Sequence, residues 1–171
     1  MNQRGSGGSV SSFTHFNEQG RARMVDVSAK PDTERTALAY SQVTMPLFVL
    51  QQIKEGKVKK GDVLAVAQVA GVMAAKQTAQ WIPMCHPLSL TSINLNFDLE
   101  EAENEGRVKI YAEVKTTGKT GVEMEALTAA QAAALTIYDM CKALDKSMVI
   151  GPTYLLEKTG GKSGAYKREE Q

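Results

Sequence analysis

Two segments of this chain alternate between apolar and polar residues, and this pattern limits the folds open to it more than any other. Residues 93–99 and 108–114 each place an apolar side chain at every second position. Because successive side chains of a strand point to opposite faces, the segments predict two antiparallel strands, joined by a turn at 101–106, with one buried face. Alternation in the opposite phase at 88–90 indicates one extra residue, a β-bulge, near Thr91–Ser92.

Two helices rich in small residues are predicted to cover that buried face. Residues 123–144 form a long alanine-rich stretch, and a second helix follows Asp62, which can cap its first turn. In this second helix apolar residues recur every three to four positions from Val63 to Ala74. Their small side chains allow a helix to lie close to a sheet.

The order of the predicted elements specifies an α+β fold. A strand at 36–43 precedes a short helix at 46–56 and the helix after Asp62, and a final extended run at 148–156 is broken at Gly151–Pro152. The result is the β-α-β-β-α-β order of a ferredoxin-like sandwich, a four-stranded antiparallel sheet with helices on one face. Few aromatic residues are available for the other face, so we expect other subunits to cover part of it.

Composition excludes several classes of protein. The chain has 171 residues and a formal net charge of +1, so a general binder of nucleic acids or membrane surfaces is not expected. No segment has the length and apolarity of a signal peptide or membrane span. Its two cysteines cannot form a disulfide scaffold, and the chain is expected in the cytoplasm.

Two short motifs leave their role open. Gly118-Lys119-Thr120 lies between a strand and a helix, but Glu113 stands where a phosphate loop requires a glycine. Its backbone could still bind an anion at the helix N-terminus, or the segment is a plain connecting loop. Cys85–His86 lies between prolines with too few further ligands for zinc, so it is either part of a site or a structural turn.

Charged residues at the two ends of the long helix are further candidates. Glu123 and Glu125 suit its first turn, and at a spacing of two they cannot share a face, so at most one points into a pocket. Asp139 and Lys142 lie three residues apart on one face. They form either a surface ion pair or an acid–base pair.

Longer segments resemble the MoaC family, the cyclic pyranopterin monophosphate synthases of molybdenum cofactor biosynthesis. The resemblance runs from about Phe13 to Gly164 and rests on segments that include Met24-Val25-Asp26-Val27, Lys60-Gly61-Asp62-Val63, Ile82-Pro83-Met84-Cys85-His86-Pro87-Leu88, Thr120-Gly121-Val122-Glu123-Met124-Glu125, Tyr138-Asp139-Met140-Cys141-Lys142 and Gly160-Gly161-Lys162-Ser163-Gly164. Such a relationship implies a lyase that converts 3′,8-cyclised dihydro-GTP to cyclic pyranopterin monophosphate and releases pyrophosphate. It also implies the ferredoxin-like fold and a homohexamer, a trimer of dimers, with sites shared between subunits.

The resemblance assigns roles residue by residue. The residues implied to be catalytic are Asp139, Lys142 and Lys60. Those implied to bind the substrate are Met84, Cys85, His86, Glu123, Met124 and Glu125 on the pterin side, and Arg35, Lys76 and Lys158 at the phosphates. For the proton transfers that rebuild the ring we expect Asp139, a lysine of lowered pKa and one glutamate. No cofactor and no dedicated metal site are expected, whereas magnesium accompanying the phosphates stays open.

Domain boundaries follow from the glycine- and serine-rich composition near the N-terminus and the glycine-rich and charged residues near the C-terminus. We expect a flexible tail or added linker at 1–12, a single catalytic domain at 13–158 and a mobile C-terminal tail at 159–171.

The class of protein that competes with an enzyme is a non-catalytic ferredoxin-like module that senses a ligand or binds RNA. RNA binding needs exposed aromatic residues on the central strands, where 107–115 offers only Tyr111. A ligand sensor would not need Asp139, Lys142 and Lys60 together.

Overall fold

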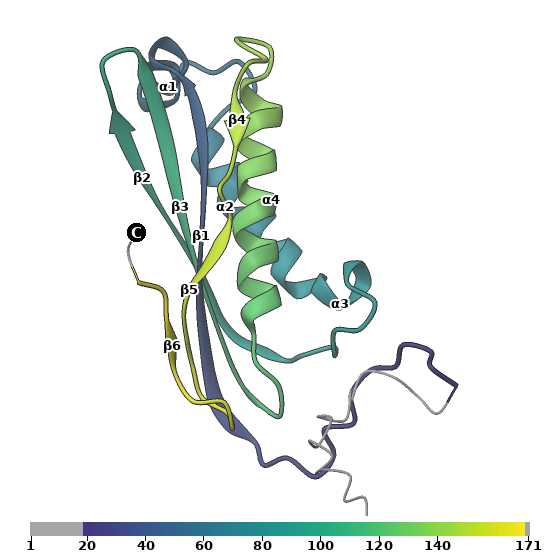
Figure 1. Cartoon of the computed structure of the whole chain (residues 1–171). Coiled ribbons are helices and arrows are strands. Elements are labelled where there is room, and N and C mark those ends of the chain that lie inside the picture. Colours follow the sequence, from purple (N-terminus) through teal and green to yellow (C-terminus); the bar gives the residue numbers. More distant parts are fainter. Residues whose placement is uncertain (1–18, 170–171) are drawn as a thin grey trace, which may run out of the picture.

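The structure is a computed structural model that describes residues 19–169, shown in Figure 1. Along the chain the elements are β1 (Thr33–Pro46), α1 (Leu47–Lys54), α2 (Val63–Lys76), α3 (Thr78–Trp81), β2 (Leu90–Glu101), β3 (Glu105–Gly118), α4 (Glu123–Cys141), β4 (Val149–Ile150), β5 (Tyr154–Thr159) and β6 (Tyr166–Lys167). The tail predicted at 1–12 lies outside the described residues, and so do residues 13–18, which begin the family resemblance and include Thr14 and His15.

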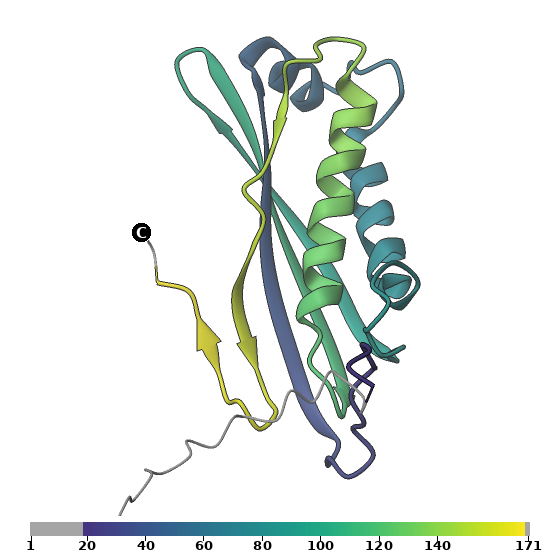
Figure 2. The ribbon, with the colours of Figure 1, turned by 45° about the vertical axis from the view of Figure 1, so that its right-hand side comes forward.

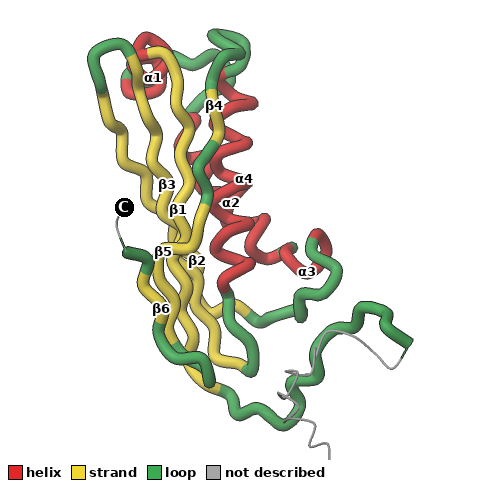
Figure 3. The backbone as a smooth tube through the Cα atoms, in the orientation of Figure 1, coloured by secondary structure: helices red, strands yellow, loops and turns green. Residues whose placement is uncertain are grey.

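The strands of residues 19–169 form one antiparallel sheet in the order β2-β3-β1-β5-β6, with β4 also paired to β1 (Figure 3). At its centre β1 and β3 pair along their whole length, from Thr33 opposite Gly118 to Pro46 opposite Glu105. The described sheet thus has six strands where the sequence predicts four. One reason is that the final run is split at Gly151–Pro152; the other is that β6 adds a strand in the segment predicted as a tail.

The predicted strand pair is confirmed. β2 and β3 pair across the expected turn, and their register shifts between Leu90 and Ser92, where the bulge is predicted. The cap of α2 is also confirmed, since the Asp62 carboxylate accepts a hydrogen bond of 3.0 Å from the Ala65 N–H. The long helix ends at Cys141, three residues before the predicted end.

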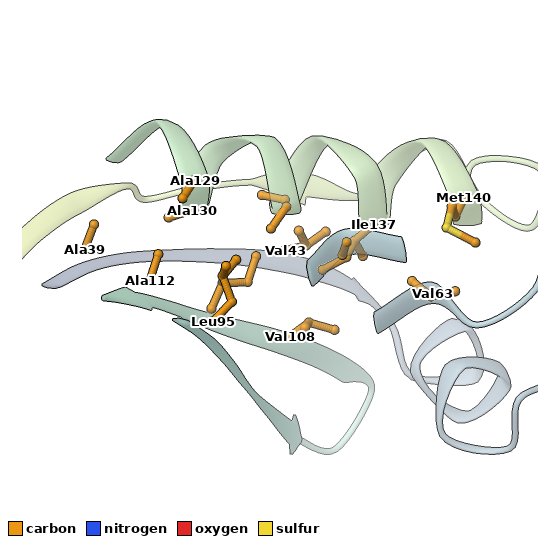
Figure 4. Packing of buried hydrophobic residues seen from close by; sticks show 14 of the residues in the cluster. Ala39, Val43, Val63, Leu95, Val108, Ala112, Ala129, Ala130, Ile137 and Met140 are labelled. Atoms are coloured by element: carbon orange, nitrogen blue, oxygen red, sulfur yellow. The ribbon is translucent and has the colours of Figure 1, made fainter. Parts of the chain in front are cut away.

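Helices α2 and α4 lie side by side on one face of the sheet (Figures 1 and 2). Small side chains make this packing close: Ala39 and Ala112 of the sheet and Ala129 and Ala130 of α4 are fully buried in the core seen in Figure 4. At Gly71 in α2, a Cβ atom would lie 2.5 Å from Leu95 Cδ2 and 3.0 Å from the Ala129 carbonyl oxygen. Only glycine therefore lets α2 lie this close to both β2 and α4.

The other face of the sheet is more polar. It carries half-buried Lys109, Tyr111 and Glu113 on β3. The ring of Tyr40 lies 5.4 Å from that of Tyr111 and 5.0 Å from that of Tyr154. That other subunits cover part of this face stays a prediction.

No helix among residues 19–169 combines the length and apolarity needed to cross a bilayer.

Candidate active site

Three of the predicted residues meet at the C-terminal end of α4, and we call Lys60, Asp139 and Lys142 the α4-end cluster. Lys142 Nζ lies 2.6 Å from Asp139 Oδ1, as expected for residues three apart on a helix. Lys60, from the turn before α2, donates to Asp139 Oδ2 and to the Asp139 carbonyl oxygen, each at 2.8 Å. Each carboxylate oxygen of Asp139 is therefore paired with a different ammonium group.

The contacts within the α4-end cluster set its protonation. Hydrogen bonds from Lys142 and then Lys60 lower the pKa of Asp139 from 3.8 to about 2. The same contact with Asp139 raises the pKa of Lys142. The expectation of a lysine of lowered pKa is therefore wrong for Lys142, because its neighbouring carboxylate stabilises the ammonium form. About half of each side chain is exposed, so these ion pairs contribute little to stability and are open to a ligand.

A second group of predicted residues surrounds the first turn of α4. Glu125 is buried, at 4% exposure, and desolvation raises the pKa of its carboxyl group. Burial, followed by the nearby charge of Glu125, also raises the pKa of the Cys85 thiol. Glu123 instead lines a surface pocket. The two glutamates thus occupy different surroundings, as their spacing predicts.

The loop between α3 and β2 supplies the other predicted pterin-side residues. Met84 is exposed here, as is Met124 on α4. His86 is half-buried, and its Nε2 atom lies 2.7 Å from the Val25 carbonyl oxygen. Since a carbonyl oxygen can only accept, Nε2 of His86 carries the hydrogen.

A pocket of about 540 Å³ beside Glu123 contains basic side chains suited to anions; it is lined by Glu123, Leu155, Lys158, Ser163, Ala165, Tyr166 and Arg168. Lys158 Nζ donates a hydrogen bond to Ser163 Oγ. Nearby, Arg35 Nε donates to the Gly118 carbonyl oxygen at 2.9 Å. A Cβ atom at Gly161, whose φ is +76°, would overlap the Arg35 guanidinium, so the glycine-rich segment and Arg35 pack directly together.

Two polar residues of this pocket, Ser163 and Arg168, are not among the residues predicted from the sequence, whereas the role predicted for Lys76 stays a prediction. Arg168, assigned to the tail, has its guanidinium carbon 4.4 Å from the centre of the Tyr154 ring. Ser163 lies within the Gly160–Gly164 motif, which could have indicated it. Lys76 is exposed in the last turn of α2 and forms no hydrogen bond or ion pair with another described residue. We call the residues at this end of α4 the α4-start cluster: Arg35, Met84, Cys85, His86, Glu123, Met124, Glu125, Lys158, Ser163 and Arg168.

The two clusters lie far apart in one chain. Glu125 and Asp139 are separated by fourteen residues of α4, or about 21 Å along the helix axis. Figure 1 shows the first residues of α4 at the lower end of the molecule and the last residues at the upper end. A single chain therefore brings Lys60, Asp139 and Lys142 together, but it does not bring them to the residues around the first turn of α4.

No metal centre marks either cluster in the described part of the chain. Residues 19–169 contain no group of three or more His, Cys, Asp or Glu side chains placed to hold a metal ion. Cys85 and Cys141 are both free, and burial raises the pKa of the Cys141 thiol to about 11. These thiols are therefore poor metal ligands and poor nucleophiles at neutral pH.

Comparison with known proteins assigns the family. The family model of the MoaC family matches residues 24–161, which include every predicted site residue from Arg35 to Lys158. The chain belongs to the MoaC family. A relative from Halalkalibacterium halodurans named cyclic pyranopterin monophosphate synthase is 66% identical over 156 residues, covering 91% of this chain and 94% of the relative. A relative of the same name from Bacillus subtilis is 63% identical over 160 residues, covering 94% of each chain.

The paired lysines predict an unusually acidic carboxyl group in this MoaC protein. Followed by NMR, Asp139 should titrate with a pKa of about 2. Because its pKa is lower in the folded than in the unfolded protein, its small stabilising effect should be present at neutral pH and be lost as the pH falls through about 2. The Lys142→Met variant should raise the pKa toward 3.8, whereas Lys146→Met, at an exposed lysine without an ion pair to a described residue, should not. An ordinary pKa in the unsubstituted protein would contradict this structure of the cluster.

Proposed function

We propose that this chain is a lyase that converts 3′,8-cyclised dihydro-GTP to cyclic pyranopterin monophosphate with release of pyrophosphate, in molybdenum cofactor biosynthesis. Its MoaC family membership and the shared name of its close relatives support this proposal. The structural observation that carries it is the convergence of two lysine ammonium groups on the exposed carboxylate of Asp139. A ligand-sensing module has no need of this arrangement.

The charges of the two clusters suit this substrate. A triphosphate and its pyrophosphate leaving group are strongly anionic, and fixed lysine and arginine side chains stabilise such groups as charge develops. Lys60 and Lys142 supply two cations at one end of α4, while Arg35, Lys158 and Arg168 supply three at the other. With a net charge of only +1, the chain concentrates its positive charge locally.

Substrate binding would change the protonation of the α4-end cluster. In the proposed mechanism, the ammonium groups of Lys60 and Lys142 donate hydrogen bonds to phosphate oxygens of the substrate instead of to Asp139. Asp139 then loses the hydrogen bonds that lower its pKa and becomes a stronger base. At the other cluster, burial favours the protonated form of Glu125, which suits a donor to the heterocycle.

The proposed active site is assembled from two chains. The two clusters are about 21 Å apart along α4, so a site that uses both must take one cluster from each of two subunits. We propose the homohexamer of three dimers that the family resemblance implies. Exposed Val66, Val69 and Met73, which recur on one side of α2, support association because they leave an apolar stripe in contact with solvent in the single chain.

The remaining parts of the proposal concern fold, cofactors and location. We assign a ferredoxin-like core of β1, α2, β2, β3, α4 and an interrupted last strand formed by β4 and β5, since both pair with β1. The enzyme would need no resident cofactor, because the reaction involves no net redox change, and magnesium would enter only with the phosphates. It would act in the cytoplasm, without a nucleic-acid partner, on a small-molecule substrate.

Substitutions in the α4-end cluster test the proposed function. Lys142→Ala and Asp139→Asn should each lower the turnover of the cyclised dihydro-GTP by roughly a hundredfold or more, because a proton-transferring or charge-stabilising group is lost. Both should leave the melting temperature nearly unchanged, since the side chains are exposed. Lys146→Ala is the matched control and should keep normal turnover. Near-normal turnover in both cluster variants would remove this pair from the mechanism.

The assembly has its own test. Light scattering on the eluting protein should give about six times the chain mass of 18.5 kDa. A stable monomer with full activity would contradict a site shared between subunits.

A further inference from the structure

An N-terminal segment lies against the α4-start cluster and connects two of its loops. The Val25 carbonyl oxygen accepts from His86 Nε2 at 2.7 Å, and the Ser28 carbonyl oxygen accepts from Lys119 Nζ at 2.7 Å. His86 belongs to the loop between α3 and β2, whereas Lys119 belongs to the loop between β3 and α4. Figures 1 and 2 both show this segment, in purple, near the end of the molecule at which α4 begins. We call residues 25–28 the strap.

The strap has a defined local shape. Asp26 Oδ1 accepts a hydrogen bond of 2.8 Å from the Ser28 N–H, and the Lys30 N–H donates to the Val27 carbonyl oxygen at 3.0 Å. The first of these is an Asx turn, which an aspartate stabilises through its own side chain. The turn places the Val25 and Ser28 carbonyl groups so that each reaches a different loop.

The strap accounts for a motif that the proposed reaction leaves unused. Lys119 lies in Gly118-Lys119-Thr120, where the sequence left open an anion site or a connecting loop. In the structure its ammonium group bonds to the strap, 91 residues away in sequence. The loop therefore has a third role, which is to hold the strap in place.

We propose that the strap, anchored by Lys119, is a positioning element that fixes the ring of His86 with the hydrogen on Nε2 and Nδ1 left as the acceptor. The inference rests on the proposed function only in placing His86 beside the substrate's ring system. The Val25 carbonyl oxygen cannot donate, so it holds one ring orientation and, in the neutral ring, the tautomer with its hydrogen on Nε2. A pterin-like heterocycle carries several N–H groups, and a fixed acceptor can orient them for reaction.

NMR of the full-length protein tests the strap directly. The His86 Nε2 hydrogen should give a ring N–H signal that exchanges slowly with water. Lys119→Met and Asp26→Ala should each abolish this signal by releasing the strap. Lys119→Arg and Asp26→Asn should retain it, because the first keeps a cationic donor and the second keeps the acceptor oxygen. A His15→Gln variant assigns the signal, since the chain has only two histidines.

Kinetics separate positioning from a general loss of structure. Lys119→Met and Asp26→Ala should lower kcat by about tenfold or more with little change in KM, because substrate binds but meets a misoriented ring. Lys119→Arg and Asp26→Asn should restore kcat, and Lys115→Met, at a lysine paired with Glu113 on β3, should leave kcat and the signal unchanged.

Two outcomes would overturn the proposal. The first is that, in the unsubstituted protein, the His86 ring carries its hydrogen on Nδ1, or that this ring hydrogen exchanges with water as fast as that of free imidazole. The other is a Lys119→Met variant that keeps the protected signal but loses turnover, which would mean that Lys119 acts on the substrate directly. Absence of turnover in the unsubstituted protein would count against the proposed function alone, because the NMR result still decides the role of the strap.

Discussion

Close packing of α4 on the central strands determines the rest of this structure. Five of the ten buried residues of α4 are alanines, and the helix packs on β1 and β3, where Ala39 and Ala112 are fully buried, so helix and sheet lie close together. A helix held in this way has functional residues at both ends, about 21 Å apart, and cannot bend to bring them together. In the proposed active site the two clusters are half-sites, and because one chain keeps them apart, a site that uses both requires a second chain.

The surroundings of the two half-sites shift the pKa values of their carboxyl groups in opposite directions. Asp139 is exposed and accepts hydrogen bonds from two lysines, which lowers its pKa, whereas Glu125 is buried without a cation and has a raised pKa. Pairs of carboxyl groups whose surroundings separate their pKa values are typical of enzymes that divide acid and base roles. Bringing the half-sites together would place a carboxylate and a neutral carboxyl group in one pocket.

Patterns in the sequence predicted those features of the structure that are set by residues close together along the chain. The alternation at 93–99 and 108–114 gave the hairpin and its bulge, and the helical spacing of Asp139 and Lys142 gave their contact. Lys60 joins them from 79 residues away, which no spacing rule predicts, so only the family resemblance indicated it. The two-residue strand β6 is too short to leave an alternating pattern, so the number of strands could be known only from the structure. The hydrogen bond from Lys119 to Ser28 spans 91 residues, so this contact of Lys119 also could be known only from the structure.

The central claim, that each active site combines the α4-end cluster of one chain with the α4-start cluster of another, is tested most directly by mixing two inactive variants. Lys142→Ala and Glu125→Gln subunits are unfolded together, refolded as mixed oligomers and assayed with cyclised dihydro-GTP. With independent choice of the two halves, about a quarter of the sites should contain two intact clusters, so about a quarter of the normal activity should return. Mixed oligomers that stay inactive would contradict the shared site.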